Sequence, residues 1–210
     1  LKIPHEIVHT DTLVNSLMRI AETKPFLDEY LGTPQEIRLL RKAKVRAITY
    51  SNQIEGNLLG ESEVTAVLKG QRVAGSKKDV KEVQNYHEAL DYVERLSEDS
   101  RPLKVADMCD LQSLVTQGLT EEKLCGCIRT VPVSIVNANN GEKIDDCPQP
   151  YELSGLLEDL WRWLEDTKNM NSFTRAFAFH FIAVSIHPFA DGNGRTVRLM
   201  QHLLLLNQIR

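Results

Sequence analysis

Apolar residues recur three and four positions apart along most of this chain of 210 residues. This spacing places them on one face of an α-helix, and only one short region shows the alternation that is typical of a β-strand. The sequence therefore predicts a mainly α fold. The expected helices cover residues of about 11–31, 33–57, 62–69, 80–96, 105–119, 151–164, 173–186 and 194–205.

The alternating region runs from Arg129 to Val136 and is rich in β-branched residues. Turn-forming residues follow it at positions 137–141, so we expect a small β-hairpin here. Pro132 has no N–H group, which limits strand pairing at that position to one side.

The composition argues against several kinds of protein. With 42% apolar residues the chain can bury one sizeable core, and we expect one globular unit. Its formal net charge of −4 and its lack of a long basic run speak against a nucleic-acid partner. No apolar stretch reaches the roughly 20 residues that span a bilayer, and the first residues do not resemble a signal peptide. We therefore expect a cytoplasmic protein with no membrane partner.

The segment from His187 to Arg198 contains the residues with the clearest chemical potential. An apolar helix leads to His187, and Pro188 helps to end that helix. The run Asp191-Gly192-Asn193-Gly194 then precedes the last helix, where unpaired N–H groups and the helix dipole favour an anion. Glycines at this point allow a phosphate to approach the backbone closely.

Four side chains of the same segment suit a phosphate-transfer reaction. Arg195 and Arg198 are three positions apart, so their guanidinium groups lie beside the same anion site. Asp191 offers one oxygen ligand for Mg²⁺, which commonly combines a carboxylate with substrate phosphates. His187 can accept a hydroxyl proton near neutral pH. The segment therefore indicates phosphoryl or nucleotidyl transfer.

The same segment resembles the signature of the Fic family, His-Pro-Phe-x-Asp-Gly-Asn-Gly-Arg-x-x-Arg, at every specified position. The resemblance implies a Fic-type helical bundle with a small β-hairpin flap. It also implies a protein adenylyltransferase that moves AMP from ATP to a Ser, Thr or Tyr hydroxyl of a target protein, with the chain itself among the candidate targets. Residues 80–210 would form the catalytic core, packed as one unit with an N-terminal helical region at 1–79.

The resemblance also implies a role for each polar residue of the segment. His187 would be the catalytic base, and Asp191 would bind Mg²⁺ that bridges the α- and β-phosphates of ATP. The nucleotide-binding residues would be Gly192, Asn193, Gly194, Arg195 and Arg198.

Gly194 distinguishes between two reactions within this family. Doc-type kinases, which resemble the same signature, carry Lys at this position and transfer the γ-phosphoryl group, so Gly194 favours AMP transfer. Relatives that transfer UMP or phosphocholine share much of the signature, which leaves ATP as the expected but less specific donor.

The predicted hairpin matches the family's flap, a Gly-x-x-Arg run followed by alternating Val and Ile. Here Gly126 and Arg129 begin that run. The flap would dock a target segment by strand-like pairing. Its residues are Arg129, Thr130, Val131, Pro132, Val133, Ser134 and Ile135.

A second family pattern, Ser or Thr followed three residues later by Glu and then Gly or Asn, occurs at Ser51, Glu55 and Gly56. It lies at the end of the helix expected over residues 33–57 and implies autoinhibition. Glu55 would pair with Arg198 and occupy the place that the γ-phosphate needs. Three alternatives stay open: a hydrolase that removes AMP with the help of Glu55, a Doc-like kinase, and a catalytically silent nucleotide-binding module.

The chain begins without Met and ends at Arg210 within a helical pattern. We therefore expect it to be part of a longer protein. Family members usually continue with a further helix that contributes to the adenine pocket. Many of them form dimers, so the resemblance is also compatible with a homodimer.

Overall fold

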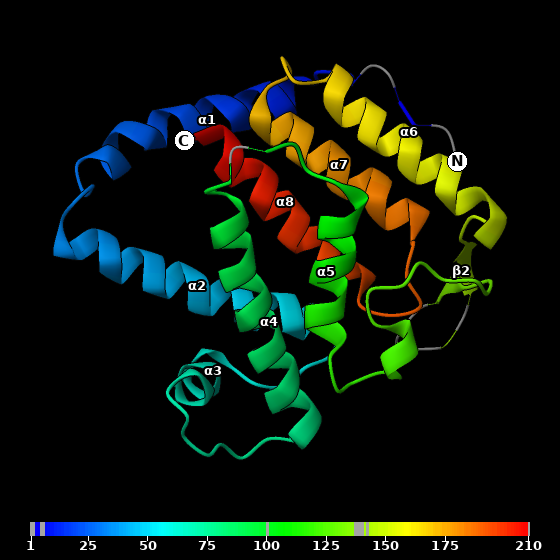
Figure 1. The fold of residues 1–210 in the computed structure, drawn as a ribbon. Coiled ribbons are helices and arrows are strands. Elements are labelled where there is room, and N and C mark those ends of the chain that lie inside the picture. The colour runs from blue at the N-terminus through cyan, green and yellow to red at the C-terminus, as the bar shows by residue number, and fades with distance from the viewer. Residues whose placement is uncertain (1–2, 5–6, 100, 137–140, 142, 210) are drawn as a thin grey trace.

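The computed structural model describes residues 3–4, 7–99, 101–136, 141 and 143–209. Within these residues the chain forms helices and one two-stranded sheet, which confirms the predicted mainly α class (Figure 1). The helices are α1 (Asp11–Asp28), α2 (Pro34–Ile54), α3 (Glu61–Leu68), α4 (Lys77–Leu96), α5 (Val105–Thr116), α6 (Leu153–Asp166), α7 (Ser172–Ile186) and α8 (Asn193–Ile209). Short 3₁₀ turns occupy Glu122–Leu124 and Pro150–Glu152.

Capping residues fix where several helices begin, and Thr33 is the one that the sequence predicts. Thr33 precedes α2 and accepts a hydrogen bond from the N–H of Glu36, while Pro34 occupies the first turn, where it leaves no donor unsatisfied. The side chain of Ser76 accepts in the same way from Asp79 and begins α4 three residues earlier than the sequence predicts.

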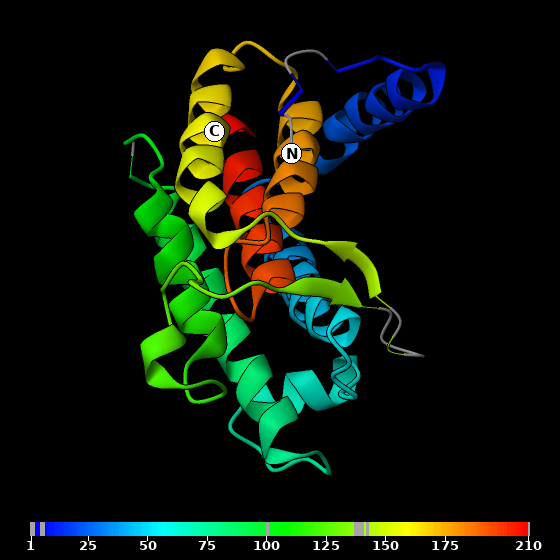
Figure 2. The ribbon, with the colours of Figure 1, turned by 90° about the vertical axis from the view of Figure 1, so that its right-hand side faces the viewer.

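Helix α8 lies at the centre of the bundle and packs against α4, α5 and α7 (Figures 1 and 2). One connected apolar core joins α2 through α8, and its largest fully buried side chains include Phe179 of α7 and Met200 of α8. Fully buried side chains of α8, among them Leu199 and Leu203, hold this helix within the core. The beginning of α8, where the predicted motif lies, faces α2 and α5.

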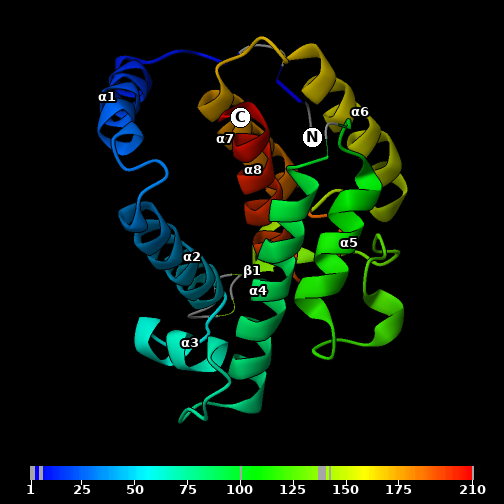
Figure 3. The same ribbon diagram turned by 60° about the vertical axis from the view of Figure 1, so that its left-hand side comes forward.

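Helix α1 has no buried residue, although its sequence predicts an apolar face. Figure 3 shows it on the outside of the molecule, joined to α2 and apart from α4 and α5. Its side chains Met18, Phe26 and Leu27 are exposed. Hydrophobic spacing thus predicts this helix correctly but does not predict how much of its apolar face is covered.

The hairpin consists of β1 (Ser134–Val136) and β2 (Lys143–Asp146), which pair antiparallel with Ser134 opposite Asp146. The predicted strand begins five residues too early, because the N–H of Arg129 bonds the carbonyl of Pro188 instead of a strand partner. The expected turn at 137–140 lies outside the described residues.

The predicted N-terminal region and catalytic core are in contact. Ile48 of α2 and Val64 of α3 belong to the same core as the later helices. Lys44 of α2 also reaches Asp91 and Glu94 of α4, with its ammonium 2.5 Å from the first carboxylate and 3.0 Å from the second. The boundary expected at 79/80 falls within the first turn of α4, and the division itself stays a prediction.

Candidate functional site

His187 lies at the point where α7 ends. Its backbone is left-handed, with φ of 51° and ψ of 60°, and its N–H still bonds the carbonyl of Ala183. Among the described residues it is the only one other than glycine with a positive φ. This conformation stops the helix and turns the following loop back toward α8.

The environment of His187 favours a neutral imidazole. Burial lowers the pKa of His187 below its usual value, and the nearby charge of Arg129 acts in the same direction. Nδ1 lies 3.3 Å from the carbonyl oxygen of Val184. In the tautomer that donates this bond, Nε2 carries the lone pair and can accept a proton.

The loop after His187 is held closed by Asn193, the first residue of α8. The side-chain oxygen of Asn193 accepts from the N–H of Phe189, and its amide donates to the carbonyl of the same residue. The Phe189 side chain is fully buried beneath. Asn193 therefore shapes the loop with its side chain, and only its backbone N–H remains for the anion site expected there.

Gly192 is required by its backbone and by its neighbours. Its φ is +77°, and a Cβ atom there would lie 2.8 Å from a methyl carbon of Thr116. Gln112 of α5 supports the same loop from below, since its amide donates to the carbonyl of Asp191 and its oxygen accepts from the N–H of Gly126. The sequence analysis did not identify this glutamine.

Asp191 presents an exposed carboxylate at the beginning of α8. Its side chain is 56% exposed, and Oδ1 accepts from the N–H of Gly192 at 2.6 Å. No group of three or more metal-ligating side chains occurs within the described ranges. A single carboxylate fits Mg²⁺ only if phosphate and water oxygens complete its coordination, which is its common mode with nucleotides.

Arg195 is buried beside this carboxylate, with only 5% of its side chain exposed. Its Nη1 lies 3.3 Å from a carboxylate oxygen of Glu82 and its Nη2 lies 3.7 Å from Asp191. Nε and Nη1 have no hydrogen-bond acceptor among the described atoms. Nη1 therefore meets Glu82 as a charge pair rather than through an aligned hydrogen bond, and Nη2, on the side of Asp191, is the donor that suits a phosphate oxygen.

Arg198 is bound by the end of α2, as the sequence predicts. Its Nη2 donates to a carboxylate oxygen of Glu55 at 2.6 Å and to the carbonyl of Ser51 at 3.0 Å, and its Nε donates to the Ser51 hydroxyl at 2.7 Å. Gly56, with φ of +92°, ends the helix and allows Glu55 to face α8.

Gly194 leaves the space that Glu55 occupies. A Cβ atom at Gly194 would overlap the carboxylate of Glu55 and lie 3.0 Å from Nη1 of Arg198. Within the first turn of α8, the backbone N–H groups have no helical carbonyl to bond. Glu55 therefore approaches the positive end of the helix dipole, where an anion is favoured.

Arg129 joins the flap to the motif. Its buried guanidinium donates to the carbonyls of His187, Val131 and Pro148 at 2.8, 2.9 and 2.6 Å. The remaining predicted flap residues are more accessible: Thr130, Val131, Pro132 and Ser134 are exposed, and Val133 and Ile135 are half-buried. A contact with a target would thus be made by these residues, while Arg129 fixes the base of the flap.

Glu82 and Asn57 are two further polar residues of the site that sequence reasoning missed. Glu82 lies on the face of α4 that also buries Val83 and Tyr86, and Asn57 follows Gly56 directly. An acidic residue on an otherwise buried helix face was the one available signal.

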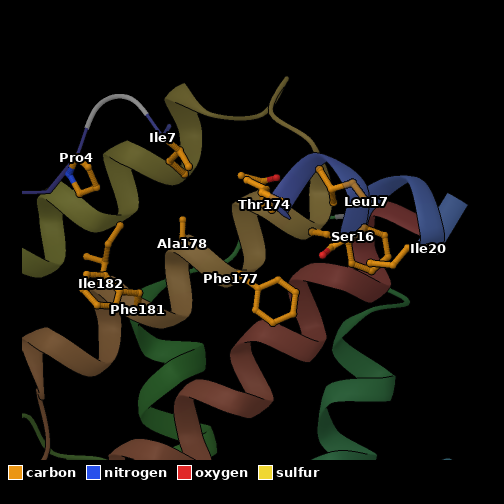
Figure 4. A pocket seen from close by; sticks show the side chains of 12 residues that line it. Pro4, Ile7, Ser16, Leu17, Ile20, Thr174, Phe177, Ala178, Phe181 and Ile182 are labelled. Carbon is orange, nitrogen blue, oxygen red and sulfur yellow. The ribbon is translucent and has the colours of Figure 1, made fainter. Parts of the chain in front are cut away.

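A separate apolar cavity of about 400 Å³ lies between α1, the segment before it and α7 (Figure 4). Its lining includes Ile7, Leu17, Phe177 and Phe181, and no residue from 187–198. It therefore plays no part in the site described above. None of the helices in the described ranges is both long and apolar enough to cross a membrane.

Known proteins are similar to this chain in sequence and in fold. Residues 102–205 match the Fic/DOC family. The chain is 30% identical over 175 residues to protein adenylyltransferase fic-1 of Caenorhabditis briggsae and 27% identical over 172 residues to protein adenylyltransferase Fic of Nematostella vectensis. Both alignments cover 80% of this chain, which spans 33% and 39% of the two relatives.

Solved structures give the same result. A Fic family protein from Desulfovibrio desulfuricans superposes with a TM-score of 0.82 at 32% identity, covering 96% of this chain and 59% of that one. A Fic domain containing signaling protein from Bacteroides thetaiotaomicron gives a TM-score of 0.77 at 26% identity, covering 90% and 72%. By sequence, by fold and by the motif at the start of α8, the chain belongs to the Fic/DOC family.

Proposed function

We propose that this chain transfers AMP from ATP to a hydroxyl group of a protein and that Glu55 inhibits the transfer. The observation that carries the proposal is the convergence of Asp191, Arg195 and Arg198 at the beginning of α8, beside His187 with its lowered pKa. The relatives named protein adenylyltransferase support the reaction type. The chain covers only part of their length, so the activity of the whole protein is part of this proposal.

In the proposed reaction, a Ser, Thr or Tyr hydroxyl oxygen attacks the α-phosphorus of ATP. Its proton passes to Nε2 of His187, the new P–O bond forms, and the bond to the β-phosphate breaks to release pyrophosphate. Arg195 and Arg198 hold phosphate oxygens and stabilise the charge that develops on them. Mg²⁺, when bound at Asp191, would neutralise the charge of the leaving pyrophosphate.

Inhibition follows from the contact between Glu55 and Arg198. A guanidinium that already donates to a carboxylate and to both oxygens of Ser51 has few donors left for a γ-phosphate. The carboxylate also lies where nucleotide phosphates would approach α8. ATP must therefore displace Glu55 or bind in another orientation, and basal transfer is slow.

The contact between Gly194 and Glu55 favours AMP transfer over a Doc-like kinase reaction. The overlap of a Cβ atom with the Glu55 carboxylate supports this, because a larger side chain at position 194 would be incompatible with the present position of Glu55. The same residues could instead remove AMP from a modified protein, with Glu55 positioning the attacking water. The experiment below distinguishes this hydrolase reaction from transfer.

The test compares wild type, Glu55→Gly, and Glu55→Gly combined with His187→Ala, each incubated with Mg²⁺ and ATP labelled at the α- or the γ-phosphate. We expect α-label on protein for Glu55→Gly, little for wild type, and none without His187. Label from the γ-phosphate alone would identify a kinase. No label on protein, together with release of AMP from a modified protein by wild type, would identify the hydrolase. Absence of both activities would leave a silent nucleotide-binding module.

The expected partners are ATP and a protein with an accessible hydroxyl side chain. The homodimer, the absence of a nucleic-acid partner and the cytoplasmic location stay predictions from the sequence. The division into a region at 1–79 and a core at 80–210 belongs to the proposal, because α2 supplies the inhibitor and α8 supplies the residues that it inhibits.

A further inference from the structure

Glu82 is a buried carboxylate on α4 that faces the phosphate-binding end of α8. Its side chain is 4% exposed, and Oε1 lies 3.3 Å from Nη1 of Arg195, which is itself 5% exposed. Apolar side chains of similar volume often replace a buried ion pair without loss of stability. A contribution to stability therefore does not explain why this ion pair is present. We consider instead its effect on the orientation of Arg195.

Arg195 lies between two acidic groups. Glu82 is buried, whereas Asp191 is 56% exposed and its Oδ1 lies 3.7 Å from Nη2 of Arg195. A charge pair is stronger where water is excluded, so Arg195 is attracted more strongly to Glu82. This attraction holds the guanidinium away from Asp191 and leaves that carboxylate accessible.

Asn57 fixes the position of Glu82. Its amide nitrogen donates to Oε2 of Glu82 at 2.8 Å and to the carbonyl of Asp79 at 3.0 Å, and its side-chain oxygen accepts from the N–H of Leu59 at 3.0 Å. Asn57 is buried, and its own N–H bonds the carbonyl of Asn52. With its donors and its acceptor in use, Asn57 has one orientation, and Glu82 is held in one orientation as well.

We propose that Glu82, held by Asn57, is a positioning residue that orients Arg195 toward the phosphates of the nucleotide and keeps Asp191 free. The proposal rests on the proposed function, because it takes a nucleotide as the ligand of this site. It assigns Nη1 of Arg195 to Glu82, and it assigns Nη2, on the side of Asp191, to a phosphate oxygen. Without the charge of Glu82, the guanidinium of Arg195 would turn to the carboxylate of Asp191. Neither group would then be available to bind the nucleotide or its Mg²⁺.

The test is a double-mutant cycle on the binding of Mg²⁺-ATP, measured by calorimetry in the Glu55→Gly background. The four proteins are the background variant, Glu82→Gln, Arg195→Gln and the double variant. We expect Glu82→Gln to weaken binding about tenfold, Arg195→Gln to weaken it at least as much, and the double variant to bind like Arg195→Gln alone. Only a residue that acts through Arg195 gives this lack of additivity.

Asp107→Asn is the matched control. Asp107 is a buried carboxylate of α5 whose Oδ1 lies 2.6 Å from the guanidinium of Arg101, outside the site. Its replacement removes the ion pair of another buried carboxylate, here with an arginine whose side chain is 39% exposed, and should lower the melting temperature but leave the affinity for Mg²⁺-ATP unchanged. A loss of affinity in this control would mean that any buried ion pair has the effect, and would overturn the proposal.

The remaining outcomes separate this proposal from the proposed function. Unchanged binding in Glu82→Gln, or losses that multiply in the double variant, would overturn the role of Glu82 while ATP transfer stands. Normal binding without transfer would refute the transfer reaction and leave the cycle valid. A background variant that binds no ATP would refute both. Should Glu82→Gln fail to fold, Asn57→Ser in the same cycle is expected to weaken binding about threefold and again to have no effect beyond Arg195→Gln.

Discussion

Removing the carboxylate of Glu55 should increase transfer by an amount that the structure allows us to estimate. The pair with Arg198 is partly accessible, with 32% of the Glu55 side chain and 20% of the Arg198 side chain exposed, and its N–O distance is 2.6 Å. A hydrogen bond between charged groups contributes roughly 1.5–3 kcal/mol, and partial exposure places this one near the lower end. If ATP must break this contact to bind productively, about 1.5–2 kcal/mol corresponds to a rate increase of roughly 10- to 30-fold.

The assay measures the initial rate of α-label incorporation at a fixed concentration of ATP for wild type, Glu55→Gln and Glu55→Gly. Glutamine keeps the size of the side chain and loses its charge, so we expect Glu55→Gln to give an increase that is smaller than that of Glu55→Gly. Glu61→Gln is the control, since Glu61 pairs with Arg46 and Tyr50 away from α8. Its rate should equal that of wild type.

Equal rates for wild type and Glu55→Gly would refute this reasoning, provided that both proteins bind ATP. Such a result would mean that the Glu55 carboxylate yields to the nucleotide at no measurable cost. A rate for Glu61→Gln that rises with that of Glu55→Gln would also contradict it, because the effect would then come from loss of any negative charge near α2.

Three further outcomes can be checked directly. Because burial lowers the pKa of His187, its base form persists below the usual histidine pKa of about 6.5. The activity of Glu55→Gly should therefore fall with acidity at a midpoint below about 6.5, and a midpoint above that value in a pH–rate profile would disagree. Phe189→Ala empties a fully buried position and should lower the free energy of unfolding by about 3–5 kcal/mol in a denaturant titration, whereas a loss below about 1 kcal/mol would show that the loop collapses into the space. Arg129→Ala removes three hydrogen bonds to backbone carbonyls and should reduce both the melting temperature and kcat. Val131→Ala, at the exposed part of the flap, should leave the melting temperature unchanged and reduce only the modification of a protein target.

The helices and the motif could be predicted from the sequence because they depend on local patterns. Periodicity identifies each long helix, and the capping residue Thr33 places the first turn of α2. The pairing of Glu55 with Arg198 was predicted as well, although it joins residues 143 positions apart, because two motifs rather than one pointed to it. Local sequence patterns and family signatures are therefore sufficient to predict the helices, the motif and this pair.

The rest depends on contacts between distant segments. The place of Glu82 on an otherwise apolar helix face hints at burial, but it does not identify Arg195 as its partner, because charged residues on helices more often face water. The side chain of Asn193 closes the loop on Phe189, which its sequence neighbours do not indicate, while its role in binding the anion stays a prediction. The first strand begins at Ser134 rather than Arg129 because the motif loop already bonds the arginine backbone. In each case a tertiary contact decided between two roles that the residue could have had.

The order of the segments along the chain has a consequence for the protein as it is synthesised. The end of α2, with Ser51 and Glu55, leaves the ribosome well before α8, whose Arg195 and Arg198 complete the site. Glu55 is therefore synthesised before Arg198, and α8 folds onto a surface where this carboxylate is already present. If Glu55 inhibits transfer as proposed, the nascent site meets its inhibitor as soon as α8 packs against α2.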